Sequence, residues 1–246
     1  FDMENYGLAV TGKGTLCIGI SSSGKTPPVT ASIVGVRQRG GYGVAVTNTA
    51  TAPMIADADG VMLIKATRGG WPTQASTACM AALIRLAVAI AAARGRGEGE
   101  APGIGAALDA LPAMMDRVAQ SYRAPAEALA KTLAKVDFVQ LCGAGPHFAP
   151  AAFGSAKLRE LAPIHAGAFP LEEYHHYRTQ KDGDVMFMIA PDQASRQRAL
   201  ETAIVGKASG GYTIALVPES ETGFDDHVQH VWRLPAVRDD LAPLLY

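Results

Sequence analysis

Cysteine, aromatic residues and an excess of charge of either sign are all scarce in this 246-residue sequence. The three cysteines are far apart, and none belongs to a C-x-x-C pair or a Cys/His cluster with metal-ligand spacing. Charged residues make up 18% of the chain and the formal net charge is -1, so no basic surplus is present to neutralise a nucleic-acid backbone. We therefore expect a reduced, cytoplasmic protein that binds neither nucleic acid nor a metal ion.

The distribution of charged and apolar residues also shows neither a signal peptide nor a typical membrane span. The sequence does not open on a charged segment followed by a short apolar one. Its longest apolar stretch runs from Ala75 to Ala93, is rich in alanine and threonine, and carries Arg85 in its middle. We expect this stretch to form a buried helix and not a span, and we expect no membrane partner.

Short apolar runs alternate with helical patterns along the chain. The runs read as strands covered on both faces, as in parallel sheets, and they are Thr15 to Ile20, Gly43 to Thr47, Gly60 to Ile64, Asp137 to Cys142, Asp184 to Ala190 and Tyr212 to Val217. Helical patterns occupy residues 29–39, 75–93, 104–134, 150–161 and 194–207. This alternation predicts a doubly wound α/β architecture. A segment rich in Gly and charge at 94–103 is the expected linker between two halves, residues 1–103 and 104–246.

A serine-rich turn follows the first expected strand and precedes a helical pattern. It reads S-S-S-G-K-T-P-P over residues 21–28. Free N–H groups, hydroxyls and the positive end of a helix dipole together favour an anion, and open parallel sheets bind ligands at this edge. The turn therefore predicts a phosphate site. Its candidate contacts are Ser21, Ser22, Ser23 and Thr26, with Gly24 and Lys25 as further candidates.

The same segment satisfies the nucleotide-binding pattern G-x-x-x-x-G-K-[ST] from Gly19 to Thr26. However, Pro27 and Pro28 remove two N–H groups from the first helical turn, where a P-loop holds phosphate. No apolar strand ends directly in an aspartate that would hold magnesium, since Ala-Pro precedes Asp192. A P-loop kinase is therefore an outside alternative, as is a purely structural turn.

The turn resembles the phosphate-binding loop of the SIS (sugar isomerase) domain family, whose usual form is S-x-S-G-x-T. This resemblance implies that the three serines and Thr26 contact phosphate. Lys25 stands where the family often has an acidic residue. The following TNTATAPMIADADGVMLIKA resembles the family's second and third strands. Trp71 and Pro72 replace small residues usual before the next helix, which bears on the shape of the sugar pocket.

A second motif, from Leu141 to Tyr177, resembles the second SIS half of glucosamine-6-phosphate synthases and their relatives. In that family a strand ends in G-x-G, the next helix carries K-L-x-E, and a G-E-x-x-H-G stretch follows. The corresponding positions here are Gly143 and Gly145 in the turn, Lys157 and Glu160 on the helix, and Glu173 and His176 in the last stretch. Lys157 and Glu160 are three residues apart, so they share a helix face.

The resemblance implies a role for each of these side chains. Moving a carbonyl between C1 and C2 of a sugar phosphate needs a base, an acid that opens the ring, and a cation near the enediolate. Glu160 is the candidate base, Lys157 the cation, and His176 the ring-opening residue because histidine titrates near neutral pH. In the resembled family this histidine comes from a neighbouring subunit, which implies a homodimer with shared sites. Lys157 and Glu160 also have the spacing of an ordinary exposed ion pair on a helix, so that interpretation stays open.

Two departures from the family pattern weaken the case for the synthase reaction itself. Phe153 occupies a helix position that is acidic in the synthases, and Glu172 and Tyr177 replace the glycines that flank the G-E-x-x-H-G stretch. The base and ring-opening positions are retained.

The resemblance implies two doubly wound, three-layer, flavodoxin-like halves, the first of them without its initial strand and helix in this sequence, and the second without its last helix. It implies a phosphosugar isomerase that interconverts aldose and ketose, or amino-sugar, phosphates through an enediolate, with no cofactor and no metal. The alternatives are the isomerase portion of a glutamine-dependent amino-sugar-phosphate synthase, a sugar-phosphate deaminase or deglycase, and a non-catalytic sugar-phosphate sensor. A phosphorylated hexose or hexosamine is the expected ligand.

Overall fold

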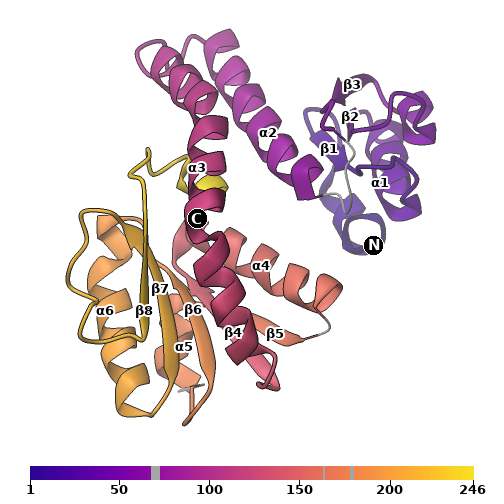
Figure 1. The fold of residues 1–246 in the computed structure, drawn as a ribbon. Helices are drawn as coiled ribbons and strands as arrows, with labels where there is room; N and C mark the ends of the chain where they lie inside the picture. Colours follow the sequence, from indigo (N-terminus) through magenta and orange to yellow (C-terminus); the bar gives the residue numbers. More distant parts are fainter. Residues whose placement is uncertain (68–72, 163, 178–179) are drawn as a thin grey trace. The chain divides into compact units, whose positions relative to one another are not determined.

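The computed structural model describes residues 1–246 apart from 68–72, 163 and 178–179, and the chain divides into two compact units, residues 1–98 and 99–246 (Figure 1). The division falls within the segment predicted as a linker, but α3 already begins at Ala101. Proline suits the first turn of a helix, and Pro102 lies there, so the helix begins earlier than the Gly-rich composition suggested. The sequence departures at Trp71 and Pro72 lie outside the described residues.

The first unit contains a parallel three-stranded sheet in the order β1-β2-β3, formed by Leu16–Ile20, Tyr42–Thr47 and Gly60–Leu63. Helix α1, Pro27–Gln38, packs closely on this sheet, since a Cβ on Gly19 would lie 2.5 Å from Cδ1 of Ile33. Ile33, Ala45, Ala52 and Met54 form the buried core. Short helical turns at Met3–Gly7, Leu8–Val10 and Pro53–Asp57 complete the unit's small elements.

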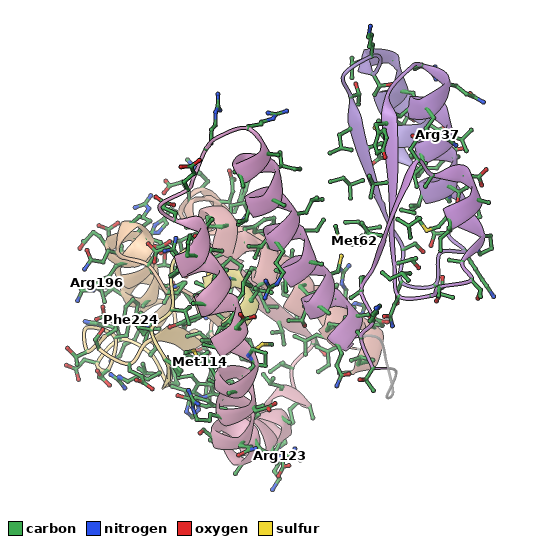
Figure 2. All side chains as sticks on the ribbon, turned by 90° about the horizontal axis from the view of Figure 1, so that it is seen from above. Arg37, Met62, Met114, Arg123, Arg196 and Phe224 are labelled. Carbon is green, nitrogen blue, oxygen red and sulfur yellow. The ribbon has the colours of Figure 1, made fainter. Side chains whose placement is uncertain are left out.

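Arg37, labelled in Figure 2, connects the end of α1 to the segment that leads into β3. Its Nε donates to Oδ1 of Asp59 at 2.8 Å, and its Nη1 donates to the carbonyl of Asp57 at 2.7 Å. The backbone N–H of Gly43 also donates to Asp59, and together with Arg37 it lowers the pKa of that carboxyl. These bonds join α1, β2 and β3, and so hold the sheet and the helix in one arrangement.

Helix α2, Thr73–Ala93, forms as the composition predicts, but the expectation that it is buried is wrong. Ala75 and Cys79 are buried, whereas Arg85 and Ala89 are exposed, and 11% of its most apolar window is buried. Its alanine content favours the helix by intrinsic propensity, without requiring a packed partner on every side. Among the described residues it is the one helix that is long and apolar enough to cross a membrane by length and composition.

The second unit is a three-layer α/β/α sandwich around a parallel five-stranded sheet of order β5-β4-β6-β7-β8. The strands are β4 Phe138–Gly143, β5 His165–Pro170, β6 Val185–Ile189, β7 Tyr212–Pro218 and β8 His230–Leu234. The helices are α3 Ala101–Leu133, α4 Phe148–Leu161, α5 Leu171–Tyr177, α6 Gln193–Ala208 and α7 Ala242–Leu245. This confirms the predicted doubly wound class.

The two faces of this sheet are covered by different helices. Met186 and Met188 of β6 join a core cluster with α5 and α6, while Val185 and Ile189 of the same strand join a cluster with α3 and α4. Alternate residues of a strand point to opposite faces, so one strand contributes to both cores. Figure 1 shows α5 and α6 on one side of the strands and α3 on the other.

Sequence analysis missed β5, α5 and β8. Both missed strands lie at the edges of the sheet, where less apolar sequences such as HAGAFP are tolerated.

The burial of Met186 in β6 predicts that two truncations of apolar side chains will differ strongly in their effect on the free energy of unfolding. Met186 is fully buried, whereas Ile204 on α6 is 44% exposed. We expect Met186→Ala to lower the free energy of unfolding by about 2–5 kcal/mol, and the control Ile204→Ala by less than about 0.5 kcal/mol. Urea unfolding followed by circular dichroism measures both. Equal losses in the two variants would contradict the assigned core.

Candidate functional site

The serine loop, residues 21–26, lies at the carboxyl end of β1, where it turns sharply towards α1. The N–H of Ser21 donates to the carbonyl of Val46 at 3.0 Å and extends the β1-β2 ladder by one residue. Gly24 then has φ +64, and a Cβ on it would lie 2.2 Å from Cβ of Ala52. Only glycine satisfies both conditions, because the left-handed backbone and the contact with Ala52 each disfavour a side chain.

The end of β2 supports the loop from beneath. The carbonyl oxygen of Ser22 accepts hydrogen bonds from the N–H of Asn48 at 3.1 Å, from Thr47 Oγ1 at 3.1 Å and from Thr49 Oγ1 at 3.2 Å. Asn48 in turn makes a two-way hydrogen bond with the backbone of Ala66, just after β3. Sequence analysis did not identify these three residues. The signal was the hydroxyl-rich TNT that follows the second strand.

The loop hydroxyls bond to one another and leave several N–H groups available. Ser21 Oγ shares a hydrogen bond with Thr26 Oγ1 at 2.9 Å and accepts the N–H of Gly24 at 3.1 Å. Within the described parts of the chain, the N–H groups of Ser22, Ser23 and Thr26 donate to no acceptor. Successive free N–H groups in a turn form an anion-binding nest. The loop can therefore accept an oxyanion with both amide and hydroxyl donors.

Helix α1 contributes no free amide of its first turn to this nest, as Pro27 and Pro28 led us to expect. Its first turn starts with Pro27 and Pro28, which have no N–H, and the N–H groups of Val29 and Thr30 both donate to the carbonyl of Thr26. The helix offers its dipole but no free amide of that turn, so the loop itself must supply the donors. A P-loop uses amides of this turn for phosphate, and the arrangement therefore disfavours a nucleotide site.

Lys25 is exposed next to the nest. Its side chain makes no hydrogen bond or ion pair with any residue that the structure describes, and its backbone N–H donates to Ser23 Oγ at 3.3 Å. A cation here raises the local positive potential and favours an anion.

In the second unit, Gly143 and Gly145 form the turn between β4 and α4. A Cβ on Gly143 would lie 2.3 Å from the carbonyl oxygen of His147, and Gly145 has φ +50. His147 is fully buried and its Nε2 lies 2.7 Å from Oδ2 of Asp192, the residue that caps α6. This contact joins the segments that follow β4 and β6.

Helix α4 brings the predicted Lys157 and Glu160 together on one face. Lys157 Nζ donates to Glu160 Oε2 at 2.5 Å, and their side chains are 21% and 39% exposed. Phe153, one turn earlier, places its ring centroid 5.3 Å from the same Nζ. The face therefore presents an aromatic ring, a cation and a carboxylate in series, in place of the acid, cation and carboxylate of the resembled family.

Helix α5 carries Glu173 and His176, and three of its other side chains hold it in place. Glu172 binds Arg198 with two hydrogen bonds, of 2.7 and 2.5 Å, and this contact lowers the pKa of the Glu172 carboxyl. The buried Tyr174 hydroxyl donates to Gln180 Oε1 at 3.2 Å. His175 Nε2 lies 2.7 Å from Thr202 Oγ1, and burial lowers the pKa of its imidazole.

The side chains of Glu173 and His176 make no hydrogen bond with any residue that the structure describes. His176 is 64% exposed, and its Nε2 is 4.0 Å from Oε1 of Glu172, too long for a hydrogen bond. Glu173 is partly exposed. The serine loop belongs to the first unit, and the acid and base candidates belong to the second. In the described ranges, no three His, Cys, Asp or Glu side chains come together as a metal site.

Comparison with known proteins finds a family match within the first unit. Residues 3–92 match the SIS domain family. The whole chain is 27% identical over 252 residues to glutamine–fructose-6-phosphate aminotransferase (isomerizing) of Corynebacterium efficiens, covering 98% of this chain and 40% of that protein. The protein of the same name from Aliivibrio fischeri is 29% identical with the same coverage. The chain thus spans about 40% of the length of these relatives.

Solved structures extend the likeness to both units. The C-terminal domain of glucosamine-fructose-6-phosphate aminotransferase from Francisella tularensis has a TM-score of 0.86 at 21% identity, covering 96% of this chain and 68% of that one. Glucosamine-6-phosphate deaminase from Thermotoga maritima has a TM-score of 0.60 at 15% identity, covering 94% and 68%. The chain therefore has the fold of these proteins across nearly all of its length.

The close contact of Gly24 predicts a difference between two glycine substitutions. Gly14 also has a positive φ, of +90, but nothing lies within 4 Å of an added Cβ, whereas the Cβ on Gly24 would meet Ala52. We expect Gly24→Ala to weaken the binding of inorganic phosphate by about tenfold or more, the equivalent of one lost charge-assisted hydrogen bond. We expect Gly14→Ala, which carries the same kind of backbone strain, to retain the affinity. Isothermal titration calorimetry measures both, and equal affinities in the two variants would exclude the serine loop as the phosphate site.

Proposed function

We propose that this chain binds a phosphorylated hexose or hexosamine and interconverts its aldose and ketose forms by proton transfer between C1 and C2. The observation that carries the proposal is the nest of free N–H groups and hydroxyls in the serine loop, at the edge where parallel sheets bind ligands. The match of residues 3–92 to the SIS domain family and the names of the relatives support a phosphosugar as the anion.

In the proposed complex the substrate phosphate lies in the serine loop. Amide donors of Ser22, Ser23 and Thr26 and the loop hydroxyls bind its oxygens, and Lys25 adds positive charge. Gly24 keeps the backbone close to the anion because it has no side chain. These contacts are the same in the ground state and the transition state, so their main effect is on affinity.

Proton transfer is assigned to the second unit. Glu160 removes the proton from one carbon and returns it to the other, which carboxylates do when held within hydrogen-bonding distance. Lys157 stabilises the negative charge that develops on the enediolate oxygen, and because this charge exists only in the transition state and intermediate, it lowers the barrier directly. His176 opens the sugar ring, with Glu173 beside it on α5 as a further substrate contact. This chemistry needs no metal ion, because Lys157 supplies the positive charge.

The proposed enzyme is a cytoplasmic homodimer in which sites are shared between subunits. His176 supports sharing because it is 64% exposed and lies on a helix that is held in place by Arg198, Gln180 and Thr202. A residue so placed can reach a site on another subunit.

A second candidate function is the isomerase portion of a glutamine-dependent amino-sugar-phosphate synthase. The match to aminotransferases over 98% of this chain favours it. Phe153 distinguishes the two, because it occupies a position that is acidic in the synthases. Production of glucosamine 6-phosphate from fructose 6-phosphate and ammonia would favour the synthase, while exchange without amine incorporation would favour the isomerase.

Solvent exchange tests the assignment of the base. Fructose 6-phosphate incubated with the protein in deuterium oxide should gain deuterium at C1 or C2, observed by NMR. We expect Glu160→Gln to slow this exchange by about 10²- to 10⁴-fold, the usual contribution of a general base, and to retain substrate affinity. Glu127→Gln, an exposed glutamate on α3, is the matched control and should exchange at the wild-type rate. Full exchange in Glu160→Gln would remove Glu160 from this role, and tight binding without any exchange in the wild type would indicate a sensor.

A further inference from the structure

The face of α4 that carries Lys157 and Glu160 includes one more side chain in contact with the ammonium. We propose that Phe153 is a positioning residue that holds Lys157 beside Glu160, an inference that rests on the proposed function. Residues 153, 157 and 160 follow the i, i+4, i+7 spacing of one helix face. Lys157 Nζ lies 5.3 Å from the ring centroid of Phe153 and 2.5 Å from Glu160 Oε2. The ammonium is thus held between a ring face and a carboxylate.

The ring limits the positions that the lysine side chain can adopt. A lysine–glutamate pair spaced i, i+3 on a helix surface is weak by itself, because the long lysine side chain loses rotamer freedom when it forms. Contact of a cation with an aromatic face within about 6 Å adds attraction at an exposed site. The Lys157 side chain is 21% exposed, less than the 39% of Glu160, which agrees with a stem covered by its neighbour.

An aromatic ring and a carboxylate at position 153 would have different electrostatic effects on Lys157 and on a bound substrate. The π face attracts the ammonium through its quadrupole but carries no net charge and accepts no proton. Among the described residues, the Lys157 charge is therefore paired with one carboxylate, Glu160. An acidic residue at position 153 would add a second negative charge beside the developing enediolate. Phe153 orients the lysine without that competing charge.

Phe153 does not belong to the core of the second unit. It is 41% exposed, and neither buried cluster of that unit includes it. Surface substitutions outside a core typically change stability by less than about 0.5 kcal/mol, so replacing the ring tests its effect on Lys157 in a folded protein. Phe138, at the start of β4, is a similarly exposed phenylalanine at 37% and is the matched control.

Steady-state kinetics with fructose 6-phosphate test the catalytic half of the inference. Phe153→Leu keeps an apolar side chain but removes the π face, whereas Phe153→Tyr keeps that face. We expect kcat to fall by about two- to fivefold in Phe153→Leu with KM unchanged, because the lost contact affects an interaction made in the transition state. Phe153→Tyr and Phe138→Leu should retain kcat. An unchanged kcat in Phe153→Leu, or an equal loss in Phe153→Tyr, would overturn the inference.

Chemical labelling of Lys157 supplies a readout that does not require turnover. The probe is acetic anhydride at limiting concentration, with the acetylation of each lysine quantified by mass spectrometry. We expect Lys157 to be acetylated about two- to fivefold faster in Phe153→Leu than in the wild type, since the ring no longer holds the ammonium. Lys131 on α3, whose labelling should not change, is the internal control.

The two readouts separate failure of this inference from failure of the proposed function. If the wild type shows no isomerase activity but Lys157 labelling still depends on the ring, the proposed function is wrong and the contact between Phe153 and Lys157 stands. If kcat falls in Phe153→Leu while Lys157 labelling stays constant, Phe153 acts by another route and the inference is overturned.

Discussion

The carbonyl oxygen of Ser22 accepts three hydrogen bonds from the end of β2, and the candidate phosphate site depends on that contact. It fixes the plane of the peptide between Ser22 and Ser23, and since the N–H of a trans peptide points opposite to its C=O, the Ser23 N–H points away from the end of β2. Gly24 then turns the backbone through a left-handed conformation against Ala52. With the loop held from beneath, its free amides are already ordered, so an anion that binds them does not bear the entropy cost of ordering the loop. The two prolines at the start of α1 make this arrangement necessary, because they remove the amides that a helix would otherwise offer.

The second unit uses a related device for α5. Glu172, Tyr174 and His175 are bound to Arg198, Gln180 and Thr202, so a helix of seven residues, too short to be stable alone, is fixed against α6 and the sheet. On this fixed helix, the side chains of Glu173 and His176 make no hydrogen bond with any described residue, and His176 is 64% exposed. Helix α4 holds Lys157 through Phe153 and Glu160 in a comparable way. In both units, neighbouring polar or aromatic side chains hold the candidate groups in place through hydrogen bonds or ring contacts.

Much of the architecture was predictable because its signals are local. All six predicted strands were found, with bounds that differ by a residue or so, since continuous apolar runs bounded by turn residues mark central parallel strands. The edge strands β5 and β8 were missed because an edge strand is paired on one side and tolerates Gly, Pro, His and Arg. Helix α2 was predicted but wrongly placed in the core, because an alanine-rich sequence is favourable for a helix whether or not it is covered.

By itself the sequence determined the order of strands and helices, the serine loop at the end of β1 and the shared face of Lys157 and Glu160, because each depends on residues close together in the chain. Only the tertiary structure decided which groups support them. Thr47, Asn48 and Thr49 reach Ser22 from a neighbouring strand, Asp192 reaches His147 across the sheet, and Arg198 reaches Glu172 from another helix. The physical reason is that these bonds join residues some 25 to 45 positions apart in the sequence. Their atoms come within about 3 Å of one another only when the chain folds.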